Sequence, residues 1–144
     1  MATHVLVPVD ESEQSNEALE FALSEYPDAQ LTALHVVDAA EIRGGVALES
    51  YSPESYGNLQ DKREERATRI LERAQSRADR HDRDLETVQM VGTVVHSIVS
   101  YASGHGVDHI VLGSHGRTGA SRVLLGSVAE KVTRRSPVPV TIVR

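Results

Sequence analysis

Cysteine and tryptophan are both absent from the sequence, and aromatic residues make up only 3% of it. Without cysteine, disulfide bonds, thiolate metal sites and thiol catalysis are excluded, which fits a reducing compartment. So few aromatic side chains offer no platform on which nucleic-acid bases could stack. Long apolar runs and a signal peptide are missing as well. We therefore expect a cytoplasmic protein with no membrane partner.

Positive charge is scarce. The formal net charge is −6, with 15 Lys and Arg against 21 Asp and Glu. Non-specific affinity for a phosphate backbone needs clustered cations, so a nucleic-acid partner is not expected. Lys62 and Lys131 are the only lysines, which fits either a GC-rich genome or a salt-adapted host.

Apolar, β-branched runs alternate with helical patterns along the chain. Strands are expected over 3–9, 30–37, 85–91, 109–112 and 137–143, and helices from Asp10 and over 60–82, 94–102 and 128–132. Strand–helix–strand units favour right-handed parallel crossovers. The sequence thus predicts a doubly wound α/β fold of flavodoxin-like type, with a five-stranded parallel sheet in the order 3-2-1-4-5. At 144 residues we expect one domain over 1–144.

Residues 38–59 show no clear periodicity and contain several glycine and proline breakers. We expect this segment to be the least ordered part of the chain and to act as a flap. The helix that follows should pack through a narrow apolar stripe. Its members are Ala67, Ile70, Leu71, Ala74 and Ala78.

A glycine-rich stretch, GSHGRTGASRVLLGS from Gly113 to Ser127, links a predicted buried strand to a predicted helix. Glycine permits positive φ and close approach of the backbone, and the first N–H groups of the next helix point outward unpaired. Such a loop suits an anion, most often phosphate, although glycines also occur where a chain simply turns. Neither a P-loop nor a dinucleotide fingerprint is present.

Asp10 follows the first strand, and two interpretations remain open. It is either the N-cap of the first helix or a carboxylate at the carboxyl edge of the sheet, where ligands of open α/β folds bind. In the predicted strand order, Asp10 and the glycine-rich loop flank the same crevice, which favours a ligand site there.

Three histidines could in principle serve as metal ligands, but their positions do not favour it. His35 is expected to be a packed or hydrogen-bonded core histidine. His105 and His109 have the four-residue spacing of helical ligands, but Gly106 makes a continuous helix improbable there.

Several motifs together resemble the universal stress protein family in its ATP-binding branch. They are GSHGRTG from Gly113, LLGSVAE from Leu124 and PVPV from Pro137, with VLVPVD from Val5 and HVV from His35. The resemblance therefore covers the whole chain. One departure is Val94, where the family often has proline, at the start of the third helix.

The resemblance implies an adenine nucleotide, ATP or else ADP or AMP, bound with or without Mg²⁺. The nucleotide-binding residues that it implies are Pro8, Val9, Asp10, Val36, Gly113, Gly116, Arg117, Gly126, Ser127 and Val128. Asp10 would face the ribose and phosphates and is the candidate metal ligand. Val36 would contact adenine through its backbone, and Gly113 would let the nucleotide approach. Gly116, Gly126, Ser127 and Val128 would cradle the phosphates, with Arg117 as a nearby positive charge.

Three function classes remain open: a nucleotide-binding regulatory protein of the stress response with an unknown protein partner, a weak ATPase or phosphotransferase, and an interaction module without ligand. The intact glycine pattern argues against the last. No recognisable base, Walker lysine or kinase signature supports the second, so any hydrolysis should fall well below the roughly 10 s⁻¹ of typical enzymes. The apolar strand at the end of the sequence would expose unpaired backbone groups, and the family pairs it with its own copy. We therefore expect a homodimer through Val138 to Val143.

Overall fold

The computed structural model describes residues 3–39, 53–115 and 125–144. Its strands are β1 (His4–Pro8), β2 (Gln30–Asp38), β3 (Glu86–Gly92), β4 (His109–Gly113) and β5 (Val140–Val143). The helices within these residues are α1 (Glu13–Glu25), α3 (Pro53–Arg80), α4 (Val94–Gly104) and α5 (Ser127–Arg135). All neighbouring strands are parallel, and their order is β3-β2-β1-β4-β5. The predicted fold class and strand order are confirmed.

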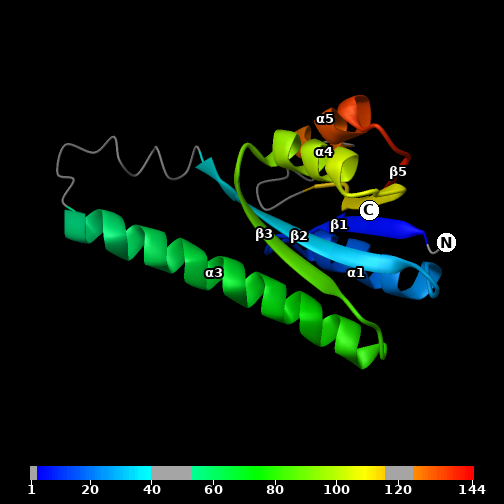
Figure 1. Ribbon diagram of the computed structural model, residues 1–144, viewed down its shortest axis with the longest axis horizontal. Helices are drawn as coiled ribbons and strands as arrows, with labels where there is room; N and C mark the ends of the chain where they lie inside the picture. Colours follow the sequence, from blue (N-terminus) through cyan, green and yellow to red (C-terminus); the bar gives the residue numbers. More distant parts are fainter. Residues whose placement is uncertain (1–2, 40–52, 116–124) are drawn as a thin grey trace.

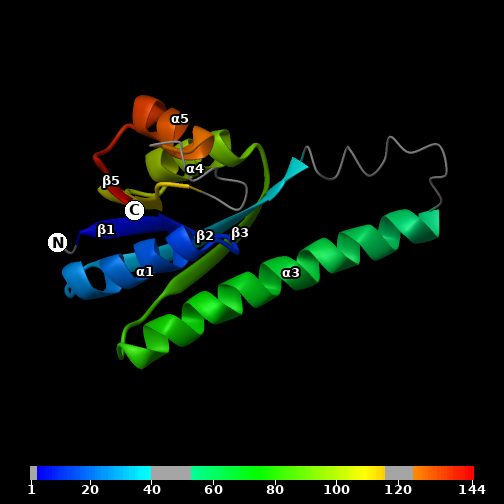
Figure 2. The same ribbon diagram turned by 180° about the vertical axis from the view of Figure 1, so that it is seen from behind.

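The sheet separates two apolar cores. Val5 and Val7 of β1 pack with α1 and α3, whereas Leu6, which points to the opposite face, packs with α4 and α5. Figures 1 and 2 show this arrangement from opposite sides, with α1 and α3 covering one face and α4 and α5 the other. Burial on both faces explains why the central strands read as continuous apolar runs.

Helix α3 is longer than predicted. It begins at Pro53, so the expectation of a poorly ordered segment is wrong for 53–59. The cause is that proline suits the first turn of a helix and does not break it there, and Gly57 weakens a helix without ending it. Residues 40–52, where the flap is predicted, lie outside the described residues. The predicted apolar stripe is confirmed from Ala67 to Ala78, with Leu71 partly buried.

Strand β5 is shorter than predicted, beginning at Val140 and not at Pro137. Ser136 holds a turn ahead of it: its hydroxyl donates to the Val138 carbonyl at 2.7 Å and lies 3.1 Å from the Val138 nitrogen. Proline, which has no N–H, cannot donate to the ladder. Pro139 still accepts a hydrogen bond from the Ile110 amide at 3.0 Å, so the pairing with β4 starts as soon as the turn ends.

Helix α4 begins at Val94 with Thr93 as its N-cap, so the missing family proline does not displace its start. β3 lies at a sheet edge, where the predicted strand order places it. In the described ranges, no helix has the length and apolar character needed to cross a membrane.

Candidate functional site

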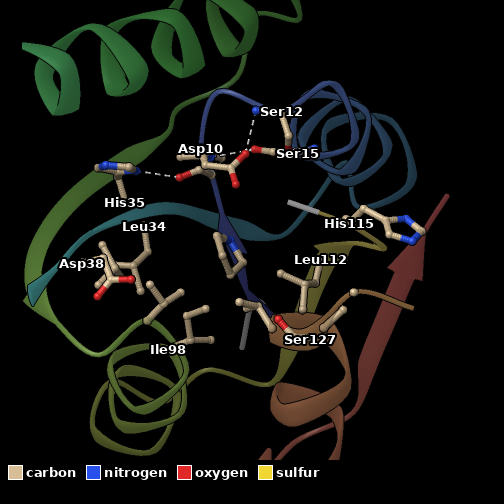
Figure 3. A pocket seen from close by; sticks show the side chains of 18 of the residues that line it. Asp10, Ser12, Ser15, Leu34, His35, Asp38, Ile98, Leu112, His115 and Ser127 are labelled. Carbon is tan, nitrogen blue, oxygen red and sulfur yellow. Dashed lines mark hydrogen bonds between the residues drawn. The ribbon is translucent and has the colours of Figure 1, made fainter. Parts of the chain in front are cut away.

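A cavity of about 680 Å³ opens at the carboxyl ends of β1, β2 and β4. Figure 3 shows side chains converging on it from the start of α1, from β2 and from α4 and α5. Most of the residues predicted to bind a nucleotide line it: Pro8, Val9, Asp10, Val36, Gly113, Gly126, Ser127 and Val128. Gly116 and Arg117 lie outside the described residues.

One wall of the cavity is a hydrogen-bonded turn between β1 and α1. The Ser12 amide donates to Asp10 Oδ1 at 2.7 Å, and the Asp10 amide donates to the Ser15 hydroxyl at 2.9 Å. The N-cap of α1 is Ser12, whose hydroxyl accepts from the Ser15 amide at 3.1 Å. The N-cap interpretation of Asp10 is therefore wrong, because Ser12 is the extended residue next to the first turn. Asp10 instead fixes the turn and presents its carboxylate at the cavity (Figure 3).

The opposite wall is the N-terminus of α5. Its first intrahelical bond runs from the Glu130 amide to the Gly126 carbonyl at 2.9 Å. The amides of Ser127, Val128 and Ala129 precede that bond and have no acceptor within the helix, and the glycine N-cap supplies no side chain to cap them. All three residues line the cavity. Unpaired amides at the positive end of a helix dipole are suited to an anion.

Two glycines that line the cavity are required by close packing within the protein, whether or not a ligand is bound. A Cβ on Gly113 would lie 2.8 Å from the backbone carbon and oxygen of Gln14, and one on Gly126 would lie 2.9 Å from the Ser114 carbonyl oxygen. The φ of Gly126 is −67°, a value that any residue can adopt, so close packing and not backbone conformation requires glycine there. Its amide donates to the Ser114 oxygen at 2.6 Å. Gly126 therefore positions α5, and the donors available to a ligand begin at Ser127.

The floor of the cavity is the open end of the core beneath α4 and α5. Its apolar lining comes from Leu34, Val36, Ile98, Leu112 and Ala129, which all belong to that core. Such a floor suits a flat, apolar group beside the polar helix end.

His35 is buried, and its Nδ1 lies 2.8 Å from the Val9 carbonyl oxygen, which confirms the predicted hydrogen-bonded histidine. A carbonyl only accepts, so Nδ1 carries the proton. His35 also lines the cavity, which its place before the end of the strand did not suggest.

The other two histidines have separate partners. His105 Nδ1 lies 3.1 Å from the Tyr101 carbonyl oxygen, and His109 Nε2 lies 2.6 Å from the Thr141 hydroxyl on β5. Burial lowers the pKa of His109, which favours its neutral form. Over 3–39, 53–115 and 125–144, no group of three or more His, Asp or Glu side chains is placed to hold a metal.

Sequence reasoning missed two arginines of α3, Arg63 and Arg66, that line the cavity. The signal was present but weak: they precede the buried residues Ala67 and Ile70 by one helical turn, so they continue nearly the same face of the helix. Their arrival at the cavity depends on how α3 crosses the sheet, which no local pattern specifies.

The strand order and the cavity at the topological switch point define an α/β protein of the doubly wound class. Residues 1–144 match the pattern of the Universal stress protein family. The chain belongs to this family.

Similar proteins span the full chain. Universal stress protein YxiE of Bacillus subtilis is 34% identical over 100% of both chains. Universal stress protein MJ0577 of Methanocaldococcus jannaschii is 33% identical over 100% of this chain and 96% of its own. The solved structure of MJ0577 superimposes with a TM-score of 0.83, covering 99% of this chain and 96% of that one at 31% identity. A universal stress protein solved in complex with cAMP has a TM-score of 0.71 and 27% identity, with coverage of 99% and 97%.

Proposed function

We propose that this universal stress protein is a regulatory protein of the ATP-binding branch, whose signal is occupancy of the cavity by ATP, or by ADP or AMP. The observation that carries the proposal is the uncapped N-terminus of α5, which faces the Asp10 turn across an apolar floor. The relative solved in complex with cAMP supports an adenine nucleotide as the ligand.

Each part of a nucleotide would meet a surface of the cavity with matching chemistry. The adenine ring would lie on the apolar floor next to the Val36 backbone, where about 680 Å³ of space falls within the range of small-ligand pockets. The amides of Ser127 and Val128, with the Ser127 hydroxyl, would bind the phosphates. Asp10 would accept a hydrogen bond from the ribose.

Asp10 would also be the protein ligand for Mg²⁺. Its Oδ1 accepts from the Ser12 amide, while Oδ2 makes no hydrogen bond within the part of the chain described. Mg²⁺ in nucleotide sites is often held by one carboxylate together with phosphate oxygens and water. We therefore expect Mg²⁺ to strengthen binding of ATP more than binding of AMP.

Thermal unfolding with and without nucleotide tests the proposal. A ligand at a hundred times its dissociation constant adds about 2.7 kcal/mol to the native state, which is roughly 5–11 °C in melting temperature for a domain of this size. No shift with ATP, ADP or AMP at millimolar concentration, with or without Mg²⁺, would refute the nucleotide proposal and leave the interaction module.

Two substitutions at Ser127 distinguish the contribution of its hydroxyl to binding from that of its backbone amide. Ser127→Ala removes only the hydroxyl and should retain most of the shift, since a lost neutral hydrogen bond costs about 0.5–1.5 kcal/mol. Ser127→Pro also removes the amide. Ser127 is the first residue of α5, the position that proline favours, and Gly126 before it is already extended with ψ of 161°. The fold should therefore survive, and the shift should fall further than in Ser127→Ala.

A further inference from the structure

The charges around the cavity do not favour an anion at the Asp10 wall. Three carboxylates line the cavity, those of Asp10, Asp38 and Glu130, and in the described residues the arginines that line it are Arg63 and Arg66. A ligand phosphate placed near Asp10 is repelled by that carboxylate. Each further phosphate adds negative charge, so ligands with several phosphates need a cation on this side of the cavity.

Arg66 reaches the side of the cavity where the Asp10 turn lies. Its Nε lies 2.7 Å from Glu11 Oε1, next to the Asp10 turn. The Nε is nevertheless buried without a hydrogen-bond partner in the described residues, so the contact is an ion pair that lacks hydrogen-bond alignment. The Arg66 and Glu11 side chains remain 29% and 38% exposed, and pairs of this kind are weak. The guanidinium can therefore exchange Glu11 for a stronger partner.

A phosphate is such a partner. The guanidinium has five N–H donors in a planar fork, which matches two oxygens of a phosphate group, and charge-assisted hydrogen bonds are roughly twice as strong as neutral ones. The backbone amide donors at the N-terminus of α5 lie on the cavity wall opposite the Asp10 turn. Phosphates beyond the reach of that wall would meet Arg66.

We propose that Arg66 is a specificity residue that makes affinity rise with the number of ligand phosphates, and that Glu11 opposes it by holding the guanidinium when no polyphosphate is present. The inference rests on the proposed function, because it assigns a nucleotide to the cavity. Binding of a polyphosphate would then break the ion pair between Glu11, just before α1, and Arg66 of α3.

Arg69 provides a matched control. It lies one turn further along α3 and carries the same charge, but it lines a separate groove of about 540 Å³ between α1 and α3 and not the cavity. Replacing it changes the net charge as much as replacing Arg66 does. It leaves the Glu11 ion pair in place.

Calorimetric titration of AMP and ATP at low salt, with EDTA present, tests the proposal in the wild type, Arg66→Gln, Arg69→Gln, Glu11→Gln and the double variant Glu11→Gln/Arg66→Gln. Arg66→Gln should raise the dissociation constant of ATP about 10-fold, the lower end for a hydrogen bond to a charged group. The constant for AMP should change less than about 3-fold, as should both constants in Arg69→Gln. Glu11→Gln should tighten ATP binding, and this gain should largely disappear in the double variant, because the freed guanidinium is gone.

Each other result decides between the two proposals. If the wild type binds neither nucleotide, both in EDTA and after Mg²⁺ replaces it, the proposed function fails and this inference fails with it. If it binds both, but Arg66→Gln weakens AMP and ATP equally or Arg69→Gln has the same effect, the role of Arg66 alone is refuted. If Glu11→Gln tightens ATP equally in both backgrounds, Glu11 acts through its charge only and does not hold Arg66.

Discussion

Gly113 lines the cavity, but the residue must be glycine because of its packing against α1. Its missing side chain leaves room for the Gln14 backbone at the start of α1. This close approach brings the end of β4 against the segment that holds Asp10, Ser12 and Ser15 in their hydrogen-bonded turn. The shape of the cavity wall thus depends on one absent methyl group.

Gly113→Ala should destabilise the protein by about 1–3 kcal/mol, the usual cost of overpacking. A Cβ at 2.8 Å from backbone atoms forces α1 to move, because backbone cannot rotate away as a side chain can. Urea denaturation measures the loss. Gly104→Ala is the control, since its Cβ would meet nothing within 4 Å, and it should be neutral or stabilising by about 0.4–1 kcal/mol. Equal effects of the two substitutions would contradict this account of Gly113.

Helices α1 and α3 are joined by Glu20. Its carboxylate contacts Arg77 at 3.0 Å and His81 at 2.7 Å, near the end of α3. Arg83, just beyond that end, donates to the carbonyls of Leu23 and Ala29 at 2.9 Å each. These contacts fix the end of α3 that is remote from the cavity.

The Glu20 contacts should contribute stability that depends on pH. Partial burial acts to raise the pKa of Glu20, but hydrogen bonds from His81 and Arg77 and their charges outweigh it and hold the pKa below its ordinary value of 4.5. A lowered pKa means that the contribution is present above the unfolded value and is lost as the pH falls through the folded one. The difference in urea midpoint between wild type and Glu20→Gln should therefore be seen at pH 7 and shrink below about pH 4.5. A difference that persists undiminished at pH 3 would show that Glu20 acts by other means.

Most elements could be predicted because their patterns are local. The alternation of apolar strands with amphipathic helices predicted the parallel α/β sheet, and the apolar stripe from Ala67 to Ala78 is buried as expected. The errors arose where local signals compete: Pro53 opens a helix, and Ser12, not Asp10, caps α1. The contact of Arg66 with Glu11 depends on the packing of two helices far apart in sequence, so it could not be read from either one.

At the scale of the whole molecule, β5 is an open edge of the sheet among the described elements. The Pro139 carbonyl accepts a hydrogen bond from Ile110 of β4, and the Val143 carbonyl accepts one from Ser114, the residue after β4. Backbone groups alternate in direction along a strand, so those of Val140 and Ile142 point away from β4 and are available to another strand. This geometry supports the proposed homodimer through Val138 to Val143.

Light scattering at tens of micromolar should give the mass of a dimer, and Val140→Pro should convert it to a monomer by removing an outward amide while keeping the ladder to β4. Val140→Thr, which keeps the amide at similar side-chain size, should remain dimeric. Circular dichroism of both variants checks that the fold is retained. A monomeric wild type would refute the dimer, and a dimeric, folded Val140→Pro would place its interface elsewhere.

The division of the interior by the sheet has a consequence for how this protein can change over time. The floor of the cavity is built from the core under α4 and α5, whereas Leu23 and Ala78 belong to the other core, well away from it. Substitutions at residues such as Leu23 and Ala78, which do not line the cavity, can adjust heat tolerance with little effect on the cavity, because distant sites contribute nearly independently. Substitutions in the cavity floor alter both the stability of the fold and the shape of the cavity. Adaptation to a hotter or colder habitat therefore has a route through residues of one layer that leaves the cavity unchanged.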